Sequence, residues 1–319
     1  MNSQSVSNIP VRVSRIWDET PEVKCFELVP LGEGLPVFRP GAHIDVVPLP
    51  GLVRQYSLFN GPEQTTSYFI GVKRELDSRG GSLAMHALKE GVEIEISEPK
   101  NNFDLIDDRA PALFIAGGIG STPLLSMARH RQAAGLAAEF HIFARDRELT
   151  PFQNEIRSLG GVSHHGMLPP KLNRTLGALL AAQSISAHLY ICGPSLFMDL
   201  VVQIASALGW EDDHLHLERF SIEVLDLDLE GDAFEVVLAQ SNATFTVKSD
   251  QTIIEALEEA GYNHLTSCEQ GVCGTCYTTV LEGEPDHRDQ YLTAEEKSSG
   301  TIIMPCVSRC KGKRLVLDI

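Results

Sequence analysis

The chain has 319 residues, a length that suits two or three domains rather than one small core. Hydrophobic residues make up 43% of the sequence, and a formal net charge of −17 argues against a nucleic-acid partner, because phosphates attract clustered Lys and Arg. No apolar run reaches the roughly 20 residues that span a bilayer. The N-terminal MNSQSVSNIP has neither the basic nor the apolar region of a secretory signal, so we expect a cytoplasmic protein.

Residues 1–106 form the first predicted domain. Short β-like runs are separated there by Gly and Pro, a pattern typical of an antiparallel barrel or sandwich. The runs are VRVSRIW, KCFELVP, HIDVVPL, RQYSLF, TSYFIGVKR and VEIEIS.

The run RQYSLFN contains a flavin candidate. It resembles the R-x-Y-S motif of the flavin-binding barrel in the ferredoxin reductase superfamily. By this resemblance Tyr56 lies against the isoalloxazine and Ser57 hydrogen-bonds near flavin N5. Arg54 meets the flavin phosphate, a role that suits a forked guanidinium, and Gln55 belongs to the same cofactor-binding set. Taken alone, these residues also fit an ordinary amphipathic strand.

The stretch GVKRELDSRGGSLAMHAL predicts a strand, a glycine turn and a helix. Gly80, Gly81 and Ser82 would present backbone amides and a hydroxyl to a phosphate at the start of that helix. The alternative is a simple capped helix with Ser82 as its N-cap. Both elements in one β-rich domain favour a flavin.

Residues 107–224 form the second predicted domain. The apolar strands ALFIAGG, AEFHIFARD and AHLYICGP alternate with helical stretches such as PLLSMARHRQAAG and SLFMDLVVQIASALG, as in a parallel sheet with helices on both faces. The turn GGIGSTP departs from the Rossmann fingerprint, because Pro123 stands where the third Gly would fall. It resembles the G-G-x-G-x-T-P segment of the reductase superfamily. Gly118, Gly120 and Thr122 would then contact the dinucleotide pyrophosphate.

Two later segments of this domain point to the nicotinamide. YICGPSLFMDLV resembles the superfamily's C-G-P segment, which implies that Cys192 sits near nicotinamide C4 while Gly193 and Pro194 shape the slot. The alternative for Cys192 is a buried thiol at a strand end. The segment HLERF ends the domain, and by resemblance Phe220 covers the flavin where the nicotinamide must enter. The alternative for Phe220 is a core aromatic residue.

The segment FARDRELT contains the predicted coenzyme-selecting residues. Arg145 and Asp146 follow a strand at the place where the adenosine ribose should lie. A carboxylate there accepts the 2′-hydroxyl of NAD and repels the 2′-phosphate of NADP, which favours NADH. The neighbouring arginines argue for NADPH, or they stack on adenine.

Residues 225–232 read as an acidic linker, and residues 233–319 form the third predicted domain. FEVVLAQSNATFTV predicts a hairpin that turns at Ser241-Asn242. TIIEALEEAG predicts a helix opened by Thr252 and closed by Gly261, and RLVLDI predicts a final strand.

Four cysteines in this domain have the spacing C-x4-C-x2-C…C of a plant-type [2Fe–2S] site: Cys268, Cys273, Cys276 and Cys306. Gly271 and Gly274 let the loop wrap tightly and aim amides at the cluster. The alternatives are a zinc site, which usually shows two C-x2-C-like pairs, or unrelated buried thiols. We do not expect Cys310 to be a ligand. Residues 233–319 look like a plant-type ferredoxin domain with a β-grasp fold.

The order of flavin barrel, nicotinamide domain and ferredoxin resembles the phthalate dioxygenase reductase family, which includes the vanillate demethylase reductases. The resemblance implies a multidomain protein with an antiparallel β-barrel flavin domain, an α/β nucleotide-binding domain and an α+β β-grasp ferredoxin domain. It implies FMN as the flavin, although physics alone leaves FAD open. The resemblance further implies that hydride passes from NADH to FMN, and that single electrons then pass through the [2Fe–2S] cluster to a Rieske-type oxygenase that hydroxylates or demethylates an aromatic or similar small molecule.

We expect a monomer with neither nucleic acid nor membrane as partner. The first alternative function is a redox-sensing regulatory flavin and iron–sulfur protein. The second is a self-contained oxygenase or reductase, for which the sequence offers no Rieske C-x-H motif. His164-His165 and His214-x-His216 are expected at the surface or at helix ends rather than as ligands.

Overall fold

The computed structural model describes residues 9–64, 66–75, 80–184, 186–220, 231–262, 264–266 and 268–319. The chain divides into two compact units, residues 1–219 and 220–319. Most of the predicted linker, residues 225–230, lies outside the described residues. Among the described helices, none has the length and apolar character needed to cross a membrane.

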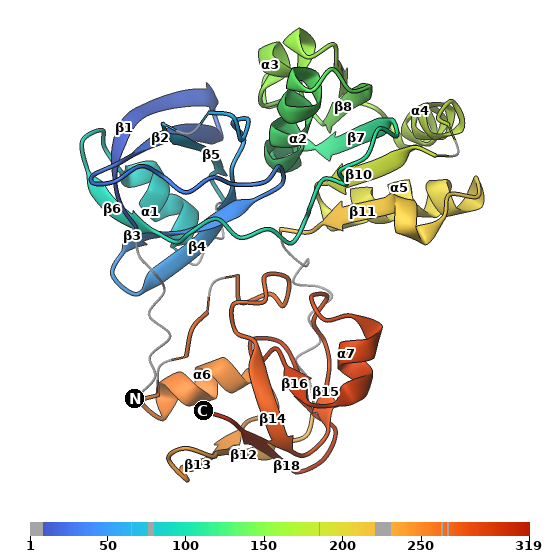
Figure 1. Ribbon diagram of the computed structural model, residues 1–319. Helices are drawn as coiled ribbons and strands as arrows, with labels where there is room; N and C mark the ends of the chain where they lie inside the picture. The colour runs from blue at the N-terminus through green and yellow to red at the C-terminus, as the bar shows by residue number, and fades with distance from the viewer. Residues whose placement is uncertain are drawn as a thin grey trace. The chain divides into compact units, whose positions relative to one another are not determined.

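The first unit begins with a six-stranded antiparallel sheet in the order β4-β3-β6-β1-β2-β5 (Figure 1). Its strands are β1 (Ile9–Thr20), β2 (Val23–Pro30), β3 (His43–Leu49), β4 (Leu52–Ser57), β5 (Tyr68–Lys73) and β6 (Glu93–Ile96). A bridge between Leu58 and Ile70 links the two edges of the sheet, which gives it a barrel-like form. In β1, Val11 and Val13 are buried and Arg12 is exposed, as expected of a strand with one face on a core. The antiparallel barrel predicted from the six β-like runs is confirmed.

A five-stranded parallel sheet follows in the order β11-β10-β7-β8-β9. Its strands are β7 (Ala112–Gly117), β8 (Ala138–Ala144), β9 (Val162–His165), β10 (His188–Cys192) and β11 (Leu215–Glu218). The sequence predicts β7, β8 and β10, whose apolar runs are buried. It does not predict β9 and β11, because these strands have four residues each and are only partly buried.

The helices of this unit are α1 (Gly81–Ala87), α2 (Ser121–Ala133), α3 (Gln153–Ser158), α4 (Pro169–Ala181) and α5 (Ser195–Ala207), with short 3₁₀ turns η1 (Gly118–Gly120) and η2 (Asp212–His214). Two separate cores identify the faces of the parallel sheet. Leu124 and Leu125 of α2 pack in one core, whereas Leu176 of α4 and Met198 of α5 pack in the other. The predicted α/β nucleotide-binding domain is therefore confirmed as a sheet covered on both faces.

The second unit contains a mixed five-stranded sheet in the order β13-β12-β18-β14-β16 (Figure 1). Its elements are β12 (Phe234–Leu238), β13 (Thr244–Val247), α6 (Ile253–Glu259), β14 (Thr278–Glu282), β15 (Pro285–Asp286), α7 (Ala294–Ser299), β16 (Ile302–Ile303), β17 (Arg309–Cys310) and β18 (Arg314–Leu317). The predicted β12–β13 hairpin is present, and Asn242 in its turn has a φ of 54°. The predicted N-cap is also present, because Thr252 and Glu255 form a capping box at the start of α6.

Candidate functional site

The four predicted cluster cysteines converge in the second unit. Cys268, Cys273 and Cys276 lie in the loop before β14, and Cys306 lies in the turn after β16. The Sγ atoms of Cys276 and Cys306 are 3.1 Å apart, and Cys268 is hydrogen-bonded to the thiols of Cys273 and Cys306. All four are free of disulfides. The structure thus brings together one set of four thiols, whereas Cys310 lies in β17 with its Sγ next to the Gly312 amide.

Two glycines make the cluster loop possible. Gly271 has a φ of +69° and Gly274 a φ of +75°, a region that L side chains rarely adopt. A Cβ on Gly271 would lie 2.5 Å from Val307 Cγ2, and one on Gly274 would lie 2.3 Å from Tyr291 Cζ. The loop can therefore fold closely against its neighbours only without those side chains.

Backbone amides support negative charge on the cluster ligands. The amide of Gln270 donates to Cys268 Sγ over 3.3 Å. Hydrogen bonds from the Cys273 and Cys306 thiols, and from the amides of Gln270 and Val272, lower the pKa of the Cys268 thiol. Four convergent thiols with amide donors form the ligand chemistry that a [2Fe–2S] cluster requires, so the residues fit that group.

Sequence reasoning did not single out Asp289, which is buried behind the cluster loop. Its Oδ2 accepts from the Leu292 amide at 2.9 Å, and its Oδ1 accepts from Ser308 Oγ at 3.3 Å. The Gln290 amide donates to the Gly271 carbonyl at 3.0 Å. This segment therefore links the glycine loop to the turn that follows Cys306. A single Asp within an ordinary DHRDQ stretch gave no signal in the sequence.

The predicted flavin residues are the last four residues of β4, namely Arg54, Gln55, Tyr56 and Ser57. Arg54 reaches the glycine turn before α1, because a Cβ on Gly81 would lie only 2.6 Å from Arg54 Nε. Burial raises the pKa of the Tyr56 hydroxyl, while the charge of Arg54 acts in the opposite direction. The two halves of the predicted phosphate site, far apart in sequence, are therefore adjacent, and an arginine beside a bare glycine turn suits a phosphate.

One alternative for the glycine turn is wrong. Ser82 is not the N-cap of α1. The N-cap is Gly80, which has a φ of 92° and makes no side-chain cap. The Ser82 hydroxyl instead accepts from the Glu75 amide at 3.1 Å, which fastens the turn to the end of the preceding strand segment. Glycine takes the cap position because its backbone conformation is left-handed there.

The GGIGSTP segment and the C-G-P segment meet through their backbones. Gly118–Gly120 form η1, and α2 begins at Ser121 with Pro123 in its first turn. A Cβ on Gly120 would lie 2.2 Å from the Cys192 carbonyl oxygen, and one on Gly193 would lie 2.8 Å from Gly117 Cα. Only bare glycines permit this approach, which places both loops at the carboxyl ends of neighbouring parallel strands, β7 and β10.

Cys192 has a titratable neighbour, Glu218, to which the sequence assigned no role. Cys192 is fully buried, and burial together with the nearby Glu218 raises the pKa of its thiol well above the usual value. Glu218 is paired with Cys192 between β10 and β11. Burial raises the Glu218 pKa to about 8, and its Oε2 atom has no hydrogen-bond partner among the described residues. The thiol is thus not a ready nucleophile.

Arg145 and Asp146 lie exposed after β8. Asp146 Oδ1 accepts from the Glu148 amide at 2.9 Å, and its carbonyl accepts from Thr150 Oγ1 at 2.6 Å, so the loop holds itself in shape. Phe220 is 38% exposed and is the first residue of the second unit. The coenzyme-selecting role of Arg145 and Asp146 and the flavin-covering role of Phe220 stay predictions.

The expectation for the histidines is confirmed for His214, which ends η2, but it needs a correction for His164 and His216. His164 lies in β9, where its Nε2 is 3.0 Å from His141 Nδ1 and its ring stacks on Phe143. His216 lies in β11, 2.9 Å from His188 through ring nitrogens. Strand positions of this kind are neither helix ends nor open surface. Imidazoles pack there against their neighbours across the parallel strands.

Comparisons with known proteins agree with this arrangement. Residues 236–311 match the family described as a 2Fe-2S iron-sulfur cluster binding domain. The chain is 37% identical to a vanillate O-demethylase oxidoreductase from Acinetobacter baylyi, covering 98% of this chain and 99% of the relative. It is 39% identical to the oxidoreductase NdmD from Pseudomonas putida over 94% of this chain, and it spans about half, 52%, of that longer relative.

A solved structure supports the whole architecture. Phthalate dioxygenase reductase, described as modular for electron transfer from pyridine nucleotides to [2Fe–2S], matches with a TM-score of 0.78 and 35% identity, over 99% of both chains. The expected reductase activity is confirmed, and FMN, NADH and [2Fe–2S] are the cofactors of this group. The chain belongs to the phthalate dioxygenase reductase family of oxygenase reductase components.

Proposed function

We propose that three domains of this chain form one electron path. Residues 1–106 bind FMN, residues 107–224 bind NADH, and residues 233–319 carry the cluster on Cys268, Cys273, Cys276 and Cys306. The observation that carries the proposal is the convergence of those four thiols in a chain whose first unit also has two glycine-built turns at the predicted cofactor positions. The acceptor is a Rieske-type oxygenase, and the protein acts in the cytoplasm as a monomer.

The residues of the first unit have binding and orienting roles. Arg54 neutralises the flavin phosphate beside Gly80, Gly81 and Ser82, while Tyr56 and Ser57 hold the ring edge. FMN held by these residues would supply the chemistry of accepting a hydride and releasing the two electrons one at a time. No side-chain acid or nucleophile is needed for this chemistry, so placement of the two rings is the main task of the protein.

In the proposal, NADH binds to the GGIGSTP segment, the C-G-P segment and the loop after β8. Amides near Gly118, Gly120 and Thr122 meet the pyrophosphate. Cys192, Gly193 and Pro194 shape the nicotinamide slot. Asp146, with Arg145 beside it, accepts the ribose 2′-hydroxyl and so favours NADH over NADPH. A fully buried, protonated Cys192 suits packing against a ring rather than covalent chemistry.

The test is anaerobic titration of the holoprotein with NADH, followed by visible absorbance. We expect bleaching of both the flavin and the iron–sulfur bands, at lower coenzyme concentrations with NADH than with NADPH. Reoxidation by an added Rieske oxygenase, in proportion to product formed, would establish the acceptor class. A colourless protein, or an unchanged spectrum with both coenzymes, contradicts the proposal. Bleaching without transfer to any oxygenase favours the redox-sensing alternative.

A further inference from the structure

We propose that Glu19 is a positioning residue for NADH. Its side chain fixes the loop of residues 145–152 of the nucleotide-binding domain against the flavin barrel. The inference rests on the proposed function, because it concerns how the chain places NADH relative to the flavin. It assigns a role to a residue of the barrel that lies in none of the recognised motifs.

The contact is one of several hydrogen bonds between the two domains of the first unit. Arg129 also donates to the Phe59 carbonyl at 2.5 Å, and His130 Nδ1 is 2.7 Å from Glu63 Oε1. Glu19 lies near the end of β1, at the tip of the β1–β2 hairpin, and its Oε1 accepts from the Phe152 amide at 2.8 Å. Phe152 is the residue before α3, and its φ of 58° is a left-handed conformation that is unusual for an aromatic residue. A backbone held in this state needs fixed surroundings, and the Glu19 carboxylate supplies one of them.

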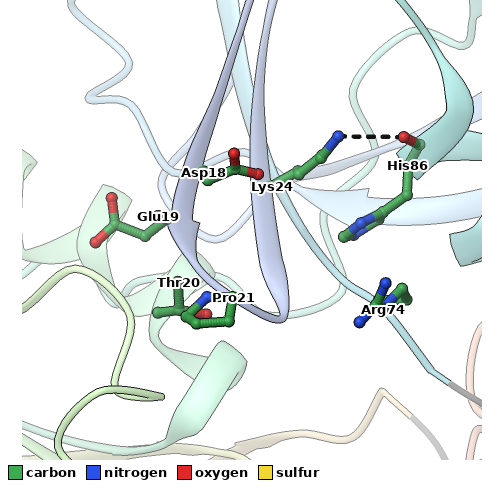
Figure 2. Close-up of a pocket in the computed structure, with 7 residues that line it drawn as sticks. All are labelled: Asp18, Glu19, Thr20, Pro21, Lys24, Arg74 and His86. Carbon is green, nitrogen blue, oxygen red and sulfur yellow. Dashed lines mark hydrogen bonds between the residues drawn. The ribbon is translucent and has the colours of Figure 1, made fainter.

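The direction of the Glu19 side chain supports this role. Figure 2 shows the hollow lined by the hairpin, with Lys24, His86 and Arg74 gathered on one side of it. Lys24 Nζ donates to the His86 carbonyl there at 3.3 Å. Glu19 lies on the other side and points away from these basic groups. The carboxyl group of Glu19 is therefore not used in an ion pair with these groups. It accepts from the Phe152 amide and also from the Trp17 side chain of β1.

The Phe152 ring makes a second contact between the same two domains. The ring is fully buried, and its centroid is 4.9 Å from that of Phe59. It also lies against β5 at Gly71, where an added Cβ would be 3.1 Å from Phe152 Cζ and 3.2 Å from Thr122 Cγ2. The hydrogen bond and the ring thus fix both the backbone and the side chain of one residue. Thr122 belongs to the GGIGSTP segment, so the contact reaches the predicted pyrophosphate loop.

Hydrogen bonds within the 145–152 loop connect Phe152 with Asp146, the residue at the predicted ribose position. Thr150 is buried and donates to the Asp146 carbonyl at 2.6 Å, and its hydroxyl is 3.1 Å from His165 Nδ1. Only Pro151 separates Thr150 from Phe152. A shift of Phe152 would therefore move Asp146, and misplacement by about 1 Å can slow a positioned reaction about 10²-fold.

The chain offers a matched control for Glu19. Like Glu19, Glu90 accepts from a backbone amide at 2.8 Å, but this amide is that of Ile16 in β1. The two hydrogen bonds have the same length, and each has one partner on β1: the acceptor Glu19 in the first and the donor Ile16 in the second. The bond to Glu90 lies wholly within the barrel. Removing each in turn separates loss of a bond to β1 from loss of the contact between domains.

The experiment compares Glu19→Ala, Glu19→Gln and Glu90→Ala in the holoprotein. We expect Glu19→Ala to weaken NAD⁺ binding in calorimetry about tenfold and to slow NADH-driven flavin reduction in stopped flow by about 10- to 100-fold. Hydrogen exchange should quicken in peptides that cover residues 145–156. Glu19→Gln keeps an acceptor oxygen and should stay within about twofold of the parent, and so should Glu90→Ala. Electron transfer from chemically reduced flavin to the cluster should be unchanged in all three.

A second variant tests the contact if Glu19→Ala folds poorly. Gly71→Ala adds a methyl group against the Phe152 ring, and we expect it to weaken NAD⁺ binding in the same direction. The inference is overturned if Glu19→Ala and Glu90→Ala behave alike, or if Glu19→Ala alters the flavin-to-cluster step instead of nucleotide binding. Failure of the proposed function would look different, because the parent protein itself would not be reduced by NADH.

Discussion

The predicted cluster loop and the predicted nucleotide loops both depend on glycine, but for different physical reasons. Gly271 and Gly274 have positive φ angles, and a Cβ there would meet side chains of Val307 and Tyr291. Gly120 has an ordinary φ of −59°, yet a Cβ there would meet the Cys192 carbonyl. The first loop is shaped so that four side chains can bind. The second is shaped so that two backbones can meet and leave their amides for a ligand.

Because the first loop binds through side chains, we expect the largest loss of electron transfer when one of its cysteines is replaced. Cys276→Ser removes one of four thiolates, and we expect the cluster and all electron transfer to the acceptor to be lost, since a [2Fe–2S] site needs four ligands. Reduction of the flavin by NADH should remain. Iron content, visible absorbance and stopped-flow flavin reduction measure the two halves separately.

Cys310→Ser is the control for this change, because Cys310 lies four residues past Cys306 but takes no part in the four-thiol set. It should keep full iron content. A Cys276→Ser protein that retains the cluster, or a Cys310→Ser protein that loses it, would show that the ligand set is assigned wrongly.

In the predicted nucleotide site, where two backbones meet, adding a methyl group should impair function more than changing a side chain. Gly120→Ala would place a Cβ 2.2 Å from the Cys192 carbonyl oxygen, a distance that forces the two loops apart. We expect the rate of flavin reduction by NADH to fall about 10²-fold, because hydride transfer depends on ring placement at the level of about 1 Å. The cluster should stay intact, as judged by its absorbance.

Gly177→Ala is the matched control for the methyl group. Gly177 lies inside α4, and a Cβ there would meet nothing within 4 Å. The substitution should stabilise the protein by about 0.5–1 kcal/mol and leave reduction unchanged. Equal losses of reduction in both variants would contradict the view that the Gly120 contact shapes the nucleotide site.

The same contrast explains what the sequence could predict. The cysteine ligands are visible because the chemistry lies in side chains at a fixed spacing, and the barrel strands are visible because apolar residues alternate. The contact of Gly81 with Arg54 and of Gly120 with Cys192 joins segments distant in the chain, so spacing alone does not reveal it. Glu19 and Asp289 gave no signal, because a lone carboxylate accepting a backbone amide has no sequence pattern.

Glu218 is an exception in this comparison. It is a titratable side chain beside the loops of Gly120 and Cys192, which otherwise meet through their backbones. Its carboxyl is buried beside Cys192, and burial raises its pKa to about 8 from the usual 4.5. Between these two values the native protein keeps a proton that the unfolded chain releases. This carboxyl should therefore lower the stability of the first unit as the pH rises through this window. Three buried or half-buried histidines of the same unit, His43, His164 and His216, act in the opposite direction below about pH 6.5, because burial lowers their pKa values to about 4.

Glu218→Gln should remove the contribution of Glu218 and leave that of the histidines, because a neutral amide has no proton to release. The stability of the parent relative to the variant should therefore fall as the pH rises between about 4.5 and 8. Calorimetric unfolding of the first unit at several pH values measures the slope, and infrared difference spectroscopy detects the protonated carboxyl group directly at neutral pH. Glu235→Gln, at an exposed position of β12, should leave both signals as they are in the parent. An ionised Glu218 at pH 6 would mean that water reaches the space beside Cys192. Binding of NADH would then have to displace this water from the predicted nicotinamide slot.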